Sequence, residues 1–167
     1  RSVWLIIYRK ETKIPSVFYP EAVEEALCFG WIDSKGNKRD DKSYFQFFAK
    51  RNPKSNWSKI NKAKVEKLIG EDLMFPAGLE MIEIAKQNGC WTALDDVENF
   101  IIPDDLQKAF DKSKKAFKYW TGFSKSSRKG ILDWIKSART KETRQKRIWQ
   151  TVELAKGNIK ANQYVKK

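Results

Sequence analysis

The side chains that could bind or catalyse concentrate between positions 28 and 61. This stretch, CFGWIDSKGNKRDDKSYFQFFAKRNPKSNWSKIN, mixes aromatic rings with carboxylates, amides and cations. Residues two apart on a β-strand share a face, so Trp31 points with Asp33, and Tyr44 points with Gln46 on a partner strand. If these faces coincide, an indole, a carboxylate, a phenol and an amide line one wall, a pattern typical of ligand binding. The candidate ligand-binding residues are Trp31, Asp33, Arg39, Tyr44, Gln46, Arg51, Ser55, Trp57 and Asn61.

The surroundings of Asp33 decide whether residues 28–61 form a ligand-binding site or only part of the hydrophobic core. A buried charge without a partner is costly in free energy. We therefore expect Asp33 to pair with Arg39, Arg51 or a helix N-terminus, and an open pocket to adjoin the pair. The competing interpretation is that the pair is structural and that the tryptophans belong to the core.

Groups suited to catalysis are scarce. The sequence contains no histidine, which excludes Ser-His-Asp and Cys-His catalysis and imidazole metal ligands. Cys28 and Cys90 lie far apart and indicate neither a disulfide framework nor a zinc site. Cys28 ends an apolar helical stretch and is interpreted as inert packing. We expect no cofactor and no metal, and an enzymatic reaction only through Asp33.

The charge balance makes anionic molecules candidate partners, but the even spread of the lysines favours a role in solubility. There are 34 Lys and Arg against 21 Asp and Glu, a net charge of +13. Such an excess attracts nucleic acid, acidic lipid or acidic protein, although lysines spread along a chain also simply confer solubility. No standard nucleic-acid-binding motif is present. A set of rings and cations that could stack on and neutralise a single strand comprises Tyr44, Phe45, Phe47, Lys50, Arg51 and Lys54.

The apolar periodicity predicts an α+β fold. An apolar, β-branched run over residues 3–8 predicts a buried strand. A helix follows, with Pro20 in its first turn and Gly30 at its end. The next residues predict two strands around a turn at 35–37. Together these segments predict a small antiparallel sheet of about three strands, packed with helices.

Beyond the sheet the pattern is helical. Ser124 and Thr140 are typical N-caps. We expect an α+β part over residues 1–72 and a helical part over residues 73–167, packed as one unit. No stretch approaches the roughly 20 apolar residues that span a bilayer, so we expect a cytoplasmic protein; because the chain opens with Arg1, export stays open.

Six motifs, in order along the chain, resemble one protein family. They are EEALCFGWIDS, YFQFFAKR, SNWSKIN, PAGLEMIEIAKQNGCW, IPDDLQKAF and SRKGILDWIKSARTKETRQKRI. Over residues 3–157 the chain resembles the YdeI/OmpD-associated proteins, also called bacteriocin-protection proteins. It departs from the family at Ala49 and Lys50, where a proline usually precedes the arginine, which puts the direction of Arg51 in doubt.

This resemblance implies a role in bacterial resistance to bacteriocins, antimicrobial peptides or envelope stress, and an association with an outer-membrane porin. It implies no reaction, cofactor or catalytic residue. We therefore expect a non-enzymatic binding or interaction protein whose partner is a small molecule, a peptide or another protein. The alternatives are a nucleic-acid-binding protein that uses its basic surface and an enzyme of unknown reaction that uses Asp33.

Overall fold

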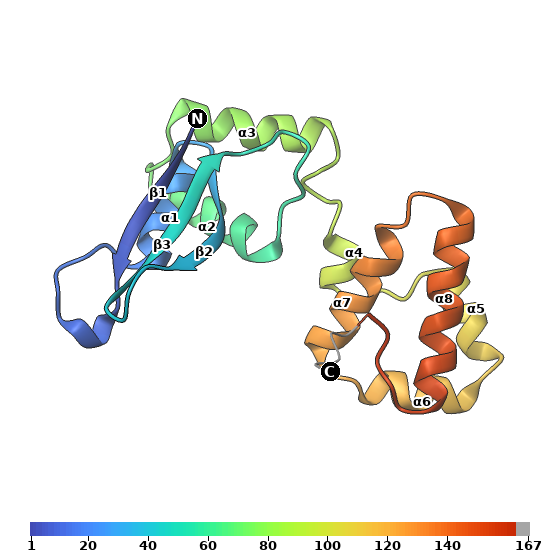
Figure 1. The fold of residues 1–167 in the computed structure, drawn as a ribbon. Helices are drawn as coiled ribbons and strands as arrows, with labels where there is room; N and C mark the ends of the chain where they lie inside the picture. The colour runs from blue at the N-terminus through green and yellow to red at the C-terminus, as the bar shows by residue number, and fades with distance from the viewer. Residues whose placement is uncertain (163–167) are drawn as a thin grey trace. The chain divides into compact units, whose positions relative to one another are not determined.

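The computed structural model describes residues 1–162 and divides the chain into two units, Arg1–Ala93 and Leu94–Lys167. The first unit combines a three-stranded sheet with helices, and the second is helical (Figure 1). The predicted α+β class is thus confirmed. The first unit consists of β1 (Ser2–Tyr8), the 3-10 turn η1 (Lys10–Thr12), α1 (Tyr19–Cys28), β2 (Trp31–Lys38), β3 (Ser43–Lys50), α2 (Lys59–Gly70) and α3 (Pro76–Gln87).

The sheet is antiparallel, with the order β1-β3-β2. Its hairpin turn lies at residues 39–42, after β2 has run through Lys38, so the predicted turn at 35–37 is wrong. The Asp40 carboxylate fixes the observed turn by accepting hydrogen bonds from the backbone N–H groups of Lys42 (2.8 Å) and Ser43 (2.7 Å). Gly36 instead lies within β2, where the register shifts.

Alternation along the strands gives the sheet two distinct faces. We call one the covered face, because α1 packs over it, and it lies away from the viewer in Figure 1. Ile7 and Phe48 are buried there. The opposite face, the open face, carries large apolar side chains that are exposed or half-buried. The covered face comprises Val3, Leu5, Ile7, Tyr44, Gln46, Phe48, Trp31 and Asp33, and the open face presents Trp4, Ile6, Phe45 and Phe47.

Helix α3 packs closely on α1. A Cβ atom built on Gly78 of α3 would lie 2.3 Å from the carbonyl oxygen of Cys28 in α1, so only glycine permits this approach. Ile82 and Ala85 of α3 join the core of the first unit. Helix α3 therefore belongs with the sheet, whereas the sequence prediction began the helical part at residue 73.

The second unit is a set of helices around one core. Ser124 and Thr140 cap α7 and α8, as predicted, by accepting hydrogen bonds from the N–H groups of Ser127 (3.2 Å) and Thr143 (3.2 Å). Ser113 caps α6 in the same way. The helices are α4 (Asp95–Glu98), α5 (Asp104–Asp111), α6 (Lys114–Gly122), α7 (Lys125–Lys136) and α8 (Lys141–Lys156).

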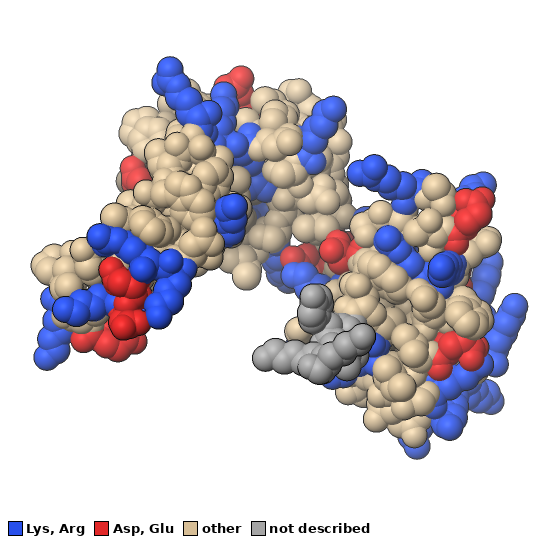
Figure 2. All heavy atoms as spheres, in the orientation of Figure 1, with Lys and Arg blue, Asp and Glu red and all other residues tan. Residues whose placement is uncertain are grey.

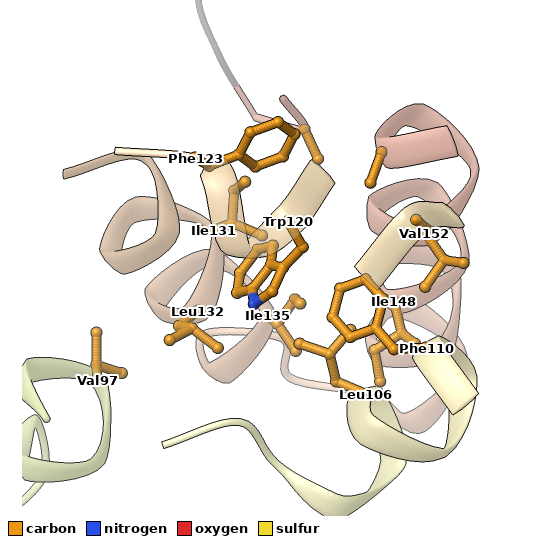
Figure 3. Close-up of a cluster of buried hydrophobic side chains, with 13 residues drawn as sticks. Val97, Leu106, Phe110, Trp120, Phe123, Ile131, Leu132, Ile135, Ile148 and Val152 are labelled. Carbon is orange, nitrogen blue, oxygen red and sulfur yellow. The ribbon is translucent and has the colours of Figure 1, made fainter. Parts of the chain in front are cut away.

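Trp120 is the centre of this second core. Its indole is 1% exposed and lies 5.3 Å from the Phe110 ring, measured between ring centroids. Ile131 and Ile135 of α7 lie next to it in Figure 3. No helix within residues 1–162 is long and apolar enough to cross a membrane.

Candidate ligand-binding groove

An open groove of about 400 Å³ lies between α1 and the covered face of the sheet. Its floor comes from β1, β2 and β3, and α1 forms one wall. Nearly all the surface it presents is carbon, so it suits an apolar group rather than a polar one. The groove is lined by Val3, Leu5, Val17, Ala22, Glu25, Ala26, Phe29, Trp31 and Phe48.

Small residues on α1 account for this space. Ala22 and Ala26 are four apart and therefore share the helix face that looks onto the sheet. Because an alanine reaches little beyond the backbone, the helix does not fill the gap to Phe48 and Trp31. Gly30, with φ +72°, then reverses the chain from α1 into β2 and brings Trp31 to the end of the groove.

A polar pair lies beside the groove. The Tyr19 hydroxyl donates a hydrogen bond of 2.6 Å to Oδ2 of Asp33. Burial, with further contributions from Asp33 and Tyr44, raises the pKa of Tyr19 to about 12. Val17 and Trp31, which line the groove, are each two residues from a member of this pair. A polar ligand group at this rim would meet the Asp33 carboxylate, which already accepts a hydrogen bond from the phenol of Tyr19.

Of the partners predicted for Asp33, the two arginines are wrong, and the contact is made at the N-terminus of a helix through a side chain. Neither Arg39 nor Arg51 bonds to it, and its partner is the side chain of Tyr19, the first residue of α1. Arg39 lies on the open face, with its guanidinium carbon 5.9 Å from the Phe45 ring centroid. The misplaced turn explains the error: with a turn at 35–37 Arg39 would lie on the strand beside Asp33, whereas it lies in the turn after β2.

Arg51 is buried at a distance from Asp33. Its guanidinium carbon lies 3.8 Å from the ring centroid of Trp57, and one N–H group donates to the carbonyl of Asn56 (2.7 Å). Burial lowers the pKa of Arg51 to about 10. Both Arg51 and Trp57 have less than 5% of their surface exposed, so for Trp57 the structure favours the core interpretation.

The structure brings together four of the nine candidate residues. Trp31 shares a face with Asp33, and Tyr44 with Gln46, as predicted; the pairing of β2 with β3 shows that the two faces, whose coincidence the sequence left open, are the same one. Only Trp31 lines the groove, Asp33 lies beside it, and Gln46 is buried. The remaining candidates lie elsewhere. The Ser55 hydroxyl donates to the Asn52 carbonyl, and Asn61 lies in the first turn of α2, where its backbone N–H donates to the Ser58 cap; Arg39, Arg51 and Trp57 are placed as above.

Most of the groove escaped the sequence prediction. Val3 and Leu5 have the pattern of buried strand residues, which predicts core packing and not a groove. Val17 lies in a loop whose sequence has no periodicity from which a position could be predicted. The signal that could have revealed the wall is the alanine pair of α1 on a face that otherwise carries larger apolar residues. Tyr19 has no such signal, because its contact spans 14 residues.

The charge of α1 is opposite to that of the whole chain. The helix carries Glu21, Glu24 and Glu25 and no Lys or Arg. Glu21 accepts a hydrogen bond from the backbone N–H of Phe18 (2.9 Å), and Glu24 pairs with Lys64 (2.6 Å), whose hydrogen bond lowers the pKa of Glu24. Glu25 lines the groove, is exposed, and has no hydrogen bond or ion pair within residues 1–162. The groove therefore joins an apolar floor to a free carboxylate.

Reactive groups are lacking at the groove. Cys28 is 4% exposed, and burial raises the pKa of its thiol, which disfavours the nucleophilic thiolate. Among residues 1–162 there is no cluster of three or more Cys, Asp and Glu side chains that could hold a metal ion. The arrangement is suited to holding a ligand, with no nucleophile and base in contact.

A second hollow, of about 510 Å³, lies between α5 and α8 of the second unit. Its lining is more polar than that of the groove, and it includes Lys108, Lys112 and Lys156. Trp149 borders it with 63% of its surface exposed. We regard it as the weaker candidate, because a much larger share of the surface it presents to a ligand is polar.

Two family models match the chain. Residues 1–81 match the model described as "Domain of unknown function (DUF8412)". Residues 99–158, which make up most of the second unit, match the model described as "Bacteriocin-protection, YdeI or OmpD-Associated". Comparisons with curated proteins and with solved structures found no match. The family resemblance seen in the sequence is thus supported over the second unit, and a different model covers the sheet and α1.

Proposed function

Residues 99–158 of this chain form a domain of the bacteriocin-protection, YdeI or OmpD-associated family, and from this premise we propose that the protein is a non-enzymatic binding protein. Its ligand site is the groove between α1 and the covered face. The ligand is an amphipathic, cationic peptide, which places apolar side chains in the groove and a Lys or Arg beside Glu25. Binding such a peptide is a route by which the protein would contribute to protection.

The apolar groove with one free carboxylate is the observation that carries this proposal. Apolar surface removed from water contributes about 25 cal/mol per Å², so one inserted aliphatic or aromatic side chain supplies most of the affinity. The carboxylate of Glu25 then selects for positive charge, because a peptide carboxylate there would be repelled. Trp31 and Phe48 supply aromatic surface of the kind that dominates the affinity of peptide-binding sites.

A binding role is favoured over catalysis because the Asp33 carboxylate is not free to accept a proton from a substrate as a general base would. Its carboxylate is held by the hydroxyl of Tyr19, and the raised pKa of Tyr19 keeps that phenol protonated near neutral pH. The pair therefore forms a polar rim that orients a ligand.

Peptide titration with groove variants tests the proposal. The ligand is a synthetic peptide of Leu and Lys, ordered so that its helix has one apolar face and one basic face. It is titrated into the full chain, and its affinity is measured by calorimetry. Ala26→Phe fills the groove and should weaken binding about tenfold or more, since one lost apolar contact is worth 1.4 kcal/mol or above. Glu25→Gln should weaken binding about two- to fivefold, the usual size of an exposed charge pair.

Two controls make the result specific. Glu66→Gln removes an exposed carboxylate from α2, outside the groove, and should leave the affinity unchanged. A peptide of the same composition with a scrambled, non-amphipathic order should bind weakly to every variant. If Ala26→Phe is folded and binds the amphipathic peptide as tightly as the parent chain, the groove is not the site.

A further inference from the structure

The open face of the sheet exposes a cluster of large apolar side chains. Trp4 is 43% and Ile6 is 39% exposed, and Phe45 and Phe47 are half-buried beside them. The indole of Trp4 meets both phenylalanine rings edge to face, with centroid distances of 4.9 Å to Phe47 and 6.2 Å to Phe45. Surface aromatic clusters of this kind mark interaction sites more often than scattered single residues do.

Two cations lie over these rings. The Lys35 ammonium is 5.6 Å from the Trp4 ring centroid, and the Arg39 guanidinium carbon is 5.9 Å from the Phe45 centroid. In Figure 2 the surface over the strands is largely uncharged; Lys and Arg lie at its margins, and at its lower end they are mixed with Asp and Glu. Rings and cations are thus interleaved on one surface, which is the arrangement that cation–π contacts hold in place.

Carboxylates are kept off this surface. The only Asp or Glu within the three strands is Asp33, and it lies on the covered face, bonded to Tyr19. In the adjoining turn Asp41 pairs with Lys38 (2.8 Å). Asp40, which accepts the hydrogen bonds that hold the turn, makes one long ion pair of 3.9 Å with Nε of Arg39. The open face therefore presents positive charge and π surface to an approaching partner.

We propose that the open face binds single-stranded nucleic acid. Bases stack on Trp4, Phe45 and Phe47, and phosphates meet Lys35 and Arg39. Stacking is open to every base because each has a π face, so binding is tolerant of sequence. The net charge of +13 adds a general attraction to the strand. This site is separate from the groove, which lies on the other face of the same sheet.

The charges favour a nucleic acid over a second apolar protein surface. A protein that covered these rings would strip water from Lys35 and Arg39 and would have to supply carboxylates to offset that cost. A nucleic acid strand supplies its phosphates at regular intervals along the chain, next to the bases that stack. One strand thus satisfies both features of the face.

Fluorescence anisotropy with a labelled oligothymidylate, on the full chain, tests this site. Trp4→Leu keeps the position apolar but removes the stacking surface, and should weaken binding about tenfold or more. Lys35→Gln should weaken binding and lower the slope of log affinity against log salt by about one. A double variant with Phe47→Leu should lose further affinity while keeping the circular dichroism spectrum of the parent chain.

Matched controls lie in the second unit. Trp149→Leu removes a tryptophan that is 63% exposed, and Lys118→Gln removes an exposed lysine; both should leave the affinity unchanged. If these controls weaken binding as much as the variants of the open face do, the strand binds the basic surface in general and the proposal fails. It also fails if Trp4→Leu abolishes self-association of the chain, seen by light scattering, while oligonucleotide affinity is unaltered, because the face is then a protein interface.

Discussion

Replacing Gly78 with alanine should destabilise the protein, although alanine is the better helix former. Gly78 lies in the first turn of α3, and exchanging a helical glycine for alanine ordinarily adds up to about 1 kcal/mol of stability. In this structure the new methyl group would lie 2.3 Å from the carbonyl oxygen of Cys28, and 2.8 Å from the carbonyl carbon of Cys28 and from the Leu27 oxygen. Real Cβ atoms do not approach that closely.

The size of the effect follows from what must move. All three contacts are backbone atoms of α1, so no side chain can rotate away, and α1 must shift from α3. Overpacking of this kind costs about 1–3 kcal/mol, and a rigid backbone contact places Gly78→Ala at the upper end. After subtracting the gain in helix propensity, the expected net loss is about 2 kcal/mol.

Urea denaturation followed by circular dichroism measures this loss. Gly130→Ala is the matched control, because Gly130 lies inside α7 and a Cβ there would meet nothing within 4 Å. It should be stabilising by up to about 1 kcal/mol. If Gly78→Ala raises the unfolding midpoint as Gly130→Ala does, the close approach of α1 and α3 is incorrect, and with it the position of the groove wall.

Three further predictions concern individual side chains. Tyr19→Phe should remove one phenol with a pKa of about 12 from the ultraviolet titration. In the parent chain the hydrogen bond of Tyr19 adds to the free energy of unfolding below pH 10.0, and this contribution disappears as the pH rises through the folded pKa. Thiol reagents should label the half-buried Cys90 of the native protein much faster than Cys28, and rapid labelling of both would contradict the packing of Cys28. Asp105→Asn should cost about 1 kcal/mol in urea denaturation, since Arg144 holds the Asp105 carboxylate by two hydrogen bonds of 2.6 Å and 2.9 Å.

The sequence predicted best what depends on local periodicity. Alternation placed Trp31 with Asp33 and Tyr44 with Gln46, and the pairing of β2 with β3 confirms both pairs and brings them onto one face. Ser124 and Thr140 were recognisable as caps because the capping bond reaches only three residues along the chain. These features need no knowledge of how distant segments meet.

Contacts between distant segments were out of reach. Gly36 followed by Asn37 predicted a turn at 35–37. The turn instead lies at 39–42, where the carboxylate of Asp40 stabilises it, and Gly36 lies inside a strand. The partner of Asp33 depends on where the start of α1 comes to lie over the sheet. The groove depends on what α1 leaves unfilled, and no pattern of residue types reports the space between two elements.

Strand β3 is the shared wall between two surfaces of opposite character. Its consecutive residues alternate between the side under α1 and the side that faces outward, so Phe48 serves one surface while its neighbour Phe47 serves the other. A single inserted or deleted residue within β3 would exchange the two sets of side chains, burying one cluster and exposing the other. Point changes can therefore tune either surface by itself, whereas any change in the length of this strand alters both at once.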